Sequence, residues 1–175
     1  MSSVVLETAR LLLRLFAADL SDVPALNEIQ SDPHHMRFYP HPFSLDESRE
    51  WIARRLVEYE EVGFSLWVVE DRATGEFLGN VGPTIEPVDG IDEVELGWSI
   101  TPRRAQGIAT EAALVCRNYC FDALRLDHVI SLIRPENTPS RGIAEKLGMT
   151  VWKETVYGSM GWPHLVYRAM APLTP

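Results

Sequence analysis

The stretch from Arg104 to Thr110 brings together a cation, a glycine and small residues at the start of a helix-like segment. Pro102 ends the strand-like segment before it, because proline has no N–H to donate to a sheet. After it, apolar residues recur at helical spacing from Ala112 to Leu124. The first amides of a helix have no internal partner, and the helix dipole gives that end a partial positive charge. We therefore predict a diphosphate site, at which Gly107 lets the ligand approach the backbone.

A tight turn with a surface arginine is the alternative interpretation of this stretch. Two common phosphate motifs do not match it. The Gly-Lys-Ser/Thr of a Walker loop does not follow, and the three spaced glycines of the dinucleotide fingerprint are missing.

The loop resembles the Q/R-x-x-G-x-G/A loop with which GCN5-related N-acetyltransferases (GNAT) hold the pyrophosphate of acetyl-coenzyme A. Four further pieces are similar to the RimJ/RimL branch of that family, whose named members acetylate the N-termini of ribosomal proteins. These pieces are ETARLLLR at 7–14, ELGW at 95–98, TEA at 110–112, and NTPS at 137–140 with EKLGM at 145–149. The resemblance covers nearly the whole chain in the expected order, and it implies one acetyltransferase domain over residues 1–175.

The resemblance also implies which residues bind acetyl-CoA. Backbone groups of the strand before the loop would hold the pantetheine arm, and the loop would hold the pyrophosphate. Asn137 would contact the cofactor near the junction of these two parts. The implied cofactor residues are Trp98, Ser99, Ile100, Arg104, Ala105, Gln106, Gly107, Ile108, Ala109, Thr110, Asn137 and Ser140.

Acetyl transfer from a thioester to an amine needs a neutral amine, a polarised carbonyl, a stabilised thiolate and in-line positioning. Strand alternation over residues 93–100 puts the apolar side chains on one face and Glu93, Glu95, Gly97 and Ser99 on the other. Glu95 therefore points away from the apolar face, where a carboxylate can take the amine proton directly or through water. Many relatives have an acid at this place. The alternative is that Glu95 is a solvent-facing glutamate of the strand, and the same interpretation applies to Glu93.

A weak base is enough if the acceptor is a terminal amine. Such an amine has a pKa of about 7.7–8.0, against about 10.4 for lysine. A useful fraction is therefore uncharged at neutral pH, and a water-relayed carboxylate suffices.

The proton donor for the leaving thiolate is predicted from the resemblance. Many members of the superfamily have a tyrosine seven residues after the asparagine, but this chain has Ala144 there. The RimJ/RimL branch instead has a serine, which corresponds to Ser140, as the proposed donor. The alternative for Asn137 and Ser140 is capping and turn formation at the last long helix, where Thr138 suits the cap and Pro139 the first helical position.

The segment from Ser31 to Phe43 is predicted to be irregular, because its prolines block a helix. By resemblance it helps to wall the acceptor pocket, with Phe38 and Tyr39 as lining residues. Its histidines are interpreted as surface residues of a substrate-facing loop rather than metal ligands. Tyr157, Trp162 and Tyr167 are further lining candidates, and core or dimer packing is the alternative for each.

Periodicity and turn signals predict a mixed α/β (α+β) domain. Ser44 and Glu47 form a capping box that opens the second helix. The three strands from 64 to 100 should form an antiparallel meander, since their connections are short. This agrees with the GNAT fold, a mixed and mostly antiparallel sheet flanked by helices. The predicted strands are 10–16, 64–70, 77–85, 93–100, 128–133, 151–157 and 165–170. The predicted helices are 19–29, 46–61, one that begins within the 104–110 stretch and runs to about residue 124, and 137–147.

Composition sets the class of protein. The chain has 175 residues, 46% of them hydrophobic, and a formal net charge of −9. This charge argues against a general nucleic-acid binder and mildly favours a cationic acceptor. Cys116 and Cys120 are too few for a disulfide framework and lack further metal ligands at suitable spacing, so we expect small core residues and no metal. No signal peptide or membrane-spanning run is recognised, and a cytoplasmic setting is expected.

The leading hypothesis is an acetyl-CoA-dependent N-acetyltransferase that acts by direct attack of a primary amine. The acceptor is left open between a protein N-terminus, an amino acid, a polyamine and an aminoglycoside. A non-catalytic acyl-CoA-binding module is the alternative, supported by Ala144, and a nucleotide-dependent enzyme is a third hypothesis. By analogy with relatives, a homodimer is possible.

Overall fold

The strands predicted between residues 64 and 100 lie at the centre of the sheet in the computed structural model, which describes residues 3–101 and 107–172. The predicted cofactor residues Arg104, Ala105 and Gln106 lie outside the described residues. The described chain forms β1 (Val4–Glu7), β2 (Leu11–Arg14), β3 (Trp67–Asp71), β4 (Phe77–Val88), β5 (Ile91–Ile100), β6 (His128–Ile133), β7 (Thr150–Tyr157) and β8 (Trp162–Met170). Its helices are α1 (Val23–Gln30), α2 (Leu45–Glu61), α3 (Ile108–Asp122) and α4 (Thr138–Lys146).

These strands make one sheet in the order β1-β2-β3-β4-β5-β6-β8-β7. The neighbours β5 and β6 are parallel, and the other recorded pairs are antiparallel. The expected mixed, mostly antiparallel sheet is therefore confirmed. The meander of β3, β4 and β5 is confirmed as well, with the Asp89-Gly90 turn joining β4 to β5.

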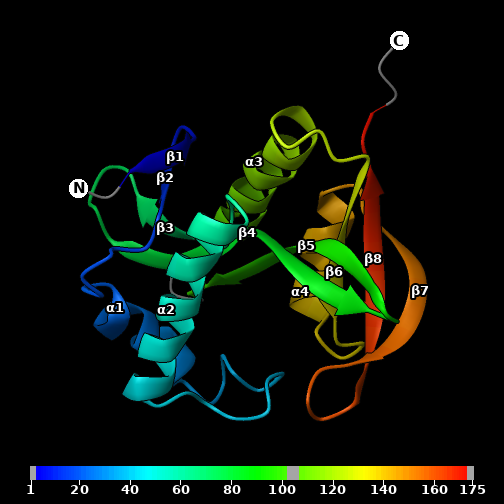
Figure 1. Ribbon diagram of the computed structural model, residues 1–175, viewed down its shortest axis with the longest axis horizontal. Coiled ribbons are helices and arrows are strands. Elements are labelled where there is room, and N and C mark those ends of the chain that lie inside the picture. Colours follow the sequence, from blue (N-terminus) through cyan, green and yellow to red (C-terminus); the bar gives the residue numbers. More distant parts are fainter. Residues whose placement is uncertain (1–2, 102–106, 173–175) are drawn as a thin grey trace.

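The helices cover both faces of this sheet (Figure 1). Helices α3 and α4 bury Ala112 and Ala144 in the main core, together with Val69 of β3. Helices α1 and α2 pack on the opposite face, where Leu26 joins Val68 in a second core cluster. Consecutive strand residues point to opposite faces, so neighbours in β3 serve both layers.

The two cysteines are buried in the main core, as expected for small apolar residues. Within the part of the chain that the structure describes, none of the helices has the length and apolar character that crossing a bilayer requires. The capping box of α2 is confirmed, since Ser44 accepts from the Glu47 N–H and Glu47 accepts from the Ser44 N–H.

The first helix begins later than predicted. It was expected from Asp19, but it begins at Val23, because Leu20 has a left-handed backbone with φ of 63°. The Asp22 carboxylate does not cap the helix. It accepts two hydrogen bonds from the Arg14 guanidinium, at 2.8 and 2.7 Å.

Several strand boundaries also differ from the prediction. β1 was not predicted, because this short edge strand has no buried face to give it a periodic pattern. β3 begins at Trp67 rather than at residue 64, and residues 64–66 instead lie over the sheet. β8 begins at Trp162 rather than at residue 165, because β7 and β8 pair up to the short Gly158–Gly161 turn.

Candidate active site

Strands β5 and β6 are joined at one point and then separate. Glu95 is the β5 residue that pairs with Ile130, and the Ser131 hydroxyl donates to the Leu96 carbonyl at 2.7 Å. Beyond this point no pairing is recorded, although β5 continues to Ile100 and β6 to Ile133. The sheet therefore opens at the C-terminal ends of its two parallel strands.

Main-chain groups of β5 face this opening. The Thr101 N–H donates to the Leu78 carbonyl of β4, and the register between β4 and β5 is regular. Successive residues of a strand alternate in the side to which their N–H and C=O point. The N–H and C=O of Trp98 and Ile100 therefore point toward β6, where β6 does not pair with them. An extended ligand in the opening can bind these groups as an additional strand would.

Within the described residues, no side chain caps the N-terminus of α3. Gly107 precedes the helix in a left-handed conformation with φ of 79°. The first hydrogen bond runs from the Glu111 N–H to the Gly107 carbonyl, at 2.9 Å. The amides of Ile108, Ala109 and Thr110 therefore have no intrahelical acceptors, as the diphosphate prediction requires.

Two pieces of the sequence that carried the family resemblance meet beside this helix end. The Thr8 hydroxyl donates to Glu111 Oε1 at 2.5 Å, and Arg10 Nε donates to Glu111 Oε2 at 2.7 Å. A Cβ built on Gly107 would lie 3.9 Å from Arg10 Nη2. The N-terminal segment therefore fixes the first turn of α3 and places a positive charge beside Gly107.

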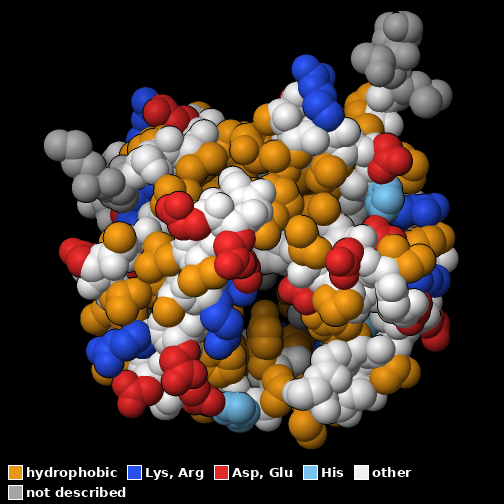
Figure 2. All heavy atoms as spheres, in the orientation of Figure 1, with side chains coloured by type: hydrophobic (Ala, Val, Ile, Leu, Met, Phe, Trp, Pro, Cys, Tyr) orange, Lys and Arg blue, Asp and Glu red, His pale blue; other side chains and the backbone are white. Residues whose placement is uncertain are grey.

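A cavity of about 340 Å³ lies on the α1–α2 side of the sheet, next to the opening between β5 and β6. Its walls come from the α1–α2 connection, α2, β4, β5, β6, the start of α4 and the β7–β8 hairpin. Figure 2 shows the hollow, with hydrophobic side chains inside and charged side chains of both signs at the rim. The predicted site residues that line it are Phe38, Tyr39, Glu95, Trp98, Ser99, Asn137, Ser140, Tyr157 and Trp162.

Tyr167 was another lining candidate, and this prediction is wrong. Tyr167 is only 2% exposed and packs in the main core, which lies on the opposite face of the sheet. Its hydroxyl accepts a hydrogen bond from Arg141 Nε at 3.1 Å. Alternation along β8 explains the difference, because Trp162 and Tyr167 are an odd number of residues apart.

Glu95 points into the cavity rather than into solvent. Its Oε1 accepts the Leu132 N–H at 3.0 Å, which holds the carboxyl at the junction of β5 and β6. Burial, and secondly the nearby Glu86 carboxylate, raise the pKa of Glu95 to about 7, although the Leu132 hydrogen bond opposes this shift. Glu93 differs, because its carboxylate pairs with His128 Nε2 at 2.7 Å and does not line the cavity.

The space beside Gly97 is partly occupied. The Leu66 side chain lies 3.5 Å from where a Gly97 Cβ would stand, and Leu66 is part of the cavity wall. Next along β5, the Ser99 hydroxyl bonds to His35 Nε2 at 2.8 Å. The irregular segment before α2 is thereby fixed to the strand that holds Glu95.

The start of α4 places two predicted residues at the cavity. Asn137, and not Thr138, is the N-cap residue, and its Oδ1 accepts the Ser140 N–H at 3.3 Å. Proline tolerates the second helical position as well as the first, since neither N–H has an intrahelical partner. The Ser140 hydroxyl makes no hydrogen bond with the described residues and lies in the cavity wall.

Sequence reasoning did not identify the polar residues that other elements bring to the cavity: Arg55, Asn80, Thr84, Glu86 and Arg134. Asn80 and Thr84 stand in an otherwise apolar run of β4, which is the one signal that would have indicated them. Arg55 and Arg134 come from α2 and from the residue after β6, and no local pattern connects them.

Residues 10–150 match the model of the acetyltransferase (GNAT) domain. The uncharacterized protein YkkB of Bacillus subtilis is 34% identical over 120 residues, which cover 68% of this chain and 70% of YkkB. The uncharacterized N-acetyltransferase YnaD of the same organism is 28% identical over 144 residues, covering 81% of this chain and 80% of YnaD.

Solved structures show the same fold. An acetyltransferase from Agrobacterium tumefaciens is 28% identical, with a TM-score of 0.79 over 97% of this chain and 95% of that one. A putative ribosomal-protein-serine acetyltransferase from Vibrio cholerae is 25% identical, with a TM-score of 0.76 over 94% of this chain and 95% of that one. The chain therefore belongs to the GNAT acetyltransferase family, and it is an N-acetyltransferase that uses acetyl-CoA.

Proposed function

We propose that the protein transfers acetyl directly from acetyl-CoA to a primary amine in the cavity, with Glu95 as the base. The observation that carries this proposal is the Glu95 carboxyl, which is held at the junction of β5 and β6 and has its pKa raised to about 7. A general base is most effective when its pKa lies near the working pH.

The proposed cofactor path follows from the free main-chain groups. The pyrophosphate binds the amides from Gly107 to Thr110, where the helix dipole supplies positive charge and the Arg10–Glu111 ion pair lies alongside. The pantetheine arm lies in the opening between β5 and β6, against Trp98 and Ile100. This path leads from the N-terminus of α3 to the cavity, where the thioester meets the amine.

In the transfer, the amine nitrogen attacks the thioester carbon, so a C–N bond forms and the C–S bond breaks. The Glu95 carboxylate accepts the proton of the amine, directly or through water. The Ser140 hydroxyl donates a proton to the departing thiolate, and Asn137 orients the start of α4 through the Ser140 N–H. Phe38 and Tyr39 form the wall on which the acceptor rests.

Direct transfer is favoured over an acetyl-cysteine intermediate. Burial raises the pKa of Cys120 to about 12 and that of Cys116 well above its usual value. The thiolate is the nucleophilic form of cysteine, so neither side chain is an effective nucleophile at neutral pH. Both also lie in the main core, and neither lines the cavity.

The acceptor is a primary amine, either the N-terminus of a protein or a small molecule. The similarity to a putative ribosomal-protein-serine acetyltransferase from Vibrio cholerae supports including ribosomal-protein N-termini among the candidates. The test is release of free coenzyme A thiol from acetyl-CoA with a panel of amines, including a ribosomal-protein N-terminal peptide. Turnover with at least one amine supports the proposal, and cofactor binding without thiol release for any amine contradicts it.

A further inference from the structure

Buried donors without partners gather at the cavity. Four buried side-chain nitrogens of the described residues have no hydrogen-bond partner: Arg55 Nε, Asn80 Nδ2, Arg117 Nε and Arg134 Nε. Three of these residues, Arg55, Asn80 and Arg134, line the cavity. Unpaired buried donors are rare in folded proteins because each gives up its hydrogen bond to water. Their concentration here indicates that the ligand brings acceptor oxygens.

Asn80 is the most deeply buried of the three. It is 2% exposed, stands on β4 and pairs in register with Ser99 of β5. Cross-strand partners share a face of the sheet, so Asn80 lies on the same face as Ser99 and Glu95. Its amide therefore belongs to the same wall as the proposed base.

Arg134 is a mostly buried cation. Its side chain is 17% exposed, and its guanidinium lies 4.3 Å from the centre of the Trp162 ring. The recorded ion pair of Arg134 joins Nε to Glu136 Oε2 at 3.5 Å, and the Glu136 side chain is 60% exposed. This distance is too long for a strong charged hydrogen bond. Arg134 is thus held in place by an aromatic ring, and its Nε makes no hydrogen bond within the described residues.

The cavity wall carries charges of both signs. Glu95 and Glu86 lie close to each other, and Glu86 accepts a hydrogen bond from the Tyr157 hydroxyl. The Tyr157 ring packs against the His164 ring at 5.6 Å, and His164 and Arg134 both line the cavity. Burial, and secondly the positive charge of Arg134, lower the pKa of His164. Arg134 therefore lies close enough to His164 to act on it electrostatically, and it supplies positive charge to this part of the cavity wall.

We propose that the acceptor is a small amino acid whose amine lies at Glu95 and whose carboxylate binds Arg134. This inference rests on the proposed transfer to a primary amine and narrows it to one substrate class. Asn80 and Arg55 also line the cavity, and they donate to the remaining lone pairs of the same carboxylate. A polyamine or an alkylamine would leave these donors unpaired, whereas a carboxylate accepts from several donors at once. A cavity of about 340 Å³ suits a small molecule.

The experiment compares amino acids with the amines that differ from them only by loss of the carboxylate. Lysine is paired with cadaverine, methionine with 3-(methylthio)propylamine, and phenylalanine with phenethylamine. The readout is kcat/KM for release of coenzyme A thiol. We expect at least one amino acid to be preferred over its amine by about ten- to a hundred-fold, the usual effect of a charged hydrogen bond.

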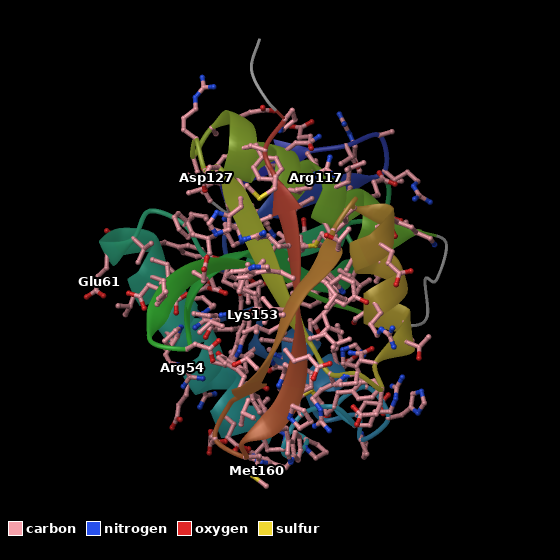
Figure 3. The ribbon with its side chains drawn as sticks, turned by 90° about the vertical axis from the view of Figure 1, so that its right-hand side faces the viewer. Arg54, Glu61, Arg117, Asp127, Lys153 and Met160 are labelled. Atoms are coloured by element: carbon pink, nitrogen blue, oxygen red, sulfur yellow. The ribbon has the colours of Figure 1, made fainter. Side chains whose placement is uncertain are left out.

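Variants assign this preference to Arg134. Arg134→Gln should lower the preference by about ten- to a hundred-fold, mainly through KM for the amino acid, and Arg134→Lys should restore part of it. Arg117→Gln is the matched control, because Arg117 Nε is also buried without a partner but does not line the cavity. Figure 3 shows Arg117 at the opposite end of the molecule from Met160, a residue of the cavity wall. The preference of the Arg117→Gln variant for an amino acid over its amine should equal that of the unaltered protein.

The outcomes separate this inference from the proposed function. Equal kcat/KM for both members of every pair, or an unchanged preference in Arg134→Gln, would overturn the inference and leave amine acetylation intact. A peptide preferred over the free amino acid at its N-terminus would also overturn it. If no amine is acetylated, calorimetry of the coenzyme A complex with methionine decides. Binding that Arg134→Gln abolishes would support the carboxylate site although transfer fails, and no binding of any amino acid would refute it.

Discussion

Replacing Glu95 with glutamine should abolish most activity and stabilise the protein at the same time. Glutamine keeps an oxygen that accepts the Leu132 N–H, so the local structure is preserved. It cannot accept the amine proton, and loss of a general base lowers rates by about 10²- to 10⁴-fold. We expect kcat/KM for the best amine of the panel to fall by this amount, while the Kd of acetyl-CoA stays the same.

The pH profile gives the second part of this prediction. With a pKa of about 7, Glu95 is about one-tenth ionised at pH 6 and about nine-tenths ionised at pH 8. Its ionisation alone therefore raises kcat/KM roughly nine-fold over this range. The acceptor amine also loses its proton as the pH rises, and the pH dependence that remains in Glu95→Gln belongs to the amine.

Ionisation of Glu95 lowers the free energy of unfolding, whereas ionisation of a carboxylate that pairs with a cation in the folded state raises it. The folded state raises the pKa of Glu95 from 4.5 to about 7, so it binds the proton more tightly than the unfolded chain does. Ionisation therefore destabilises the fold progressively from about pH 4.5, and the effect is complete above pH 7. A pKa shift of this size lowers the free energy of unfolding by about 3 kcal/mol when Glu95 is fully ionised. Glu95→Gln should raise Tm by roughly 5 to 10 °C at pH 8 and by much less at pH 5.

Glu93→Gln is the matched control. Glu93 shares the strand and the face of Glu95, but its carboxylate pairs with His128 outside the cavity. This variant should keep its activity and should not gain stability at pH 8. If Glu95→Gln retains activity within a factor of three, or if its Tm at pH 8 does not rise, then the description of Glu95 as a buried base is refuted.

Three further predictions test other parts of the site and fold. Ser140→Ala should lower kcat far more than it changes the Kd of acetyl-CoA; unchanged turnover would remove Ser140 from the mechanism. Gly107→Val should weaken acetyl-CoA binding at least about ten-fold, because the side chain is strained at φ of 79° and covers the helix amides, whereas Gly75→Val, at φ of 71° in an open turn, should not. Asp22→Ala leaves the Arg14 guanidinium, whose side chain is 10% exposed, with Glu70 as its one carboxylate partner among the described residues, and should lower the free energy of unfolding in urea by about 3–5 kcal/mol. The exposed Asp46, paired with Arg49, should cost under about 1 kcal/mol when replaced by alanine.

Local sequence patterns predicted most of the elements. The Ser44 capping box, the meander and the helix that follows Gly107 all arise from neighbouring residues, and these features are present in the structure. β1 has no such local signal, since its partner β2 holds it at the sheet edge. Leu20 broke the predicted first helix through a backbone conformation that its residue type does not indicate.

Local sequence patterns predicted the candidate site only where one strand or one helix end defines it, and the lining residues Phe38 and Tyr39 were predicted from the family resemblance. Strand alternation correctly predicted that Glu95 lies on the face of the sheet opposite the apolar core. It did not predict whether this face borders solvent or a cavity. That depends on α2 and on the β7–β8 hairpin, which are distant in the sequence. Arg55 and Arg134 were missed for the same reason, because their meeting at one cavity is a property of the tertiary fold.

A crystal structure with coenzyme A bound tests the central claim most directly. We expect the pyrophosphate oxygens at the amides of residues 107–110, the pantetheine arm between β5 and β6, and the thiol in the cavity within reach of Glu95. A pyrophosphate bound elsewhere on the molecule, or a thiol directed away from that cavity, would contradict the account.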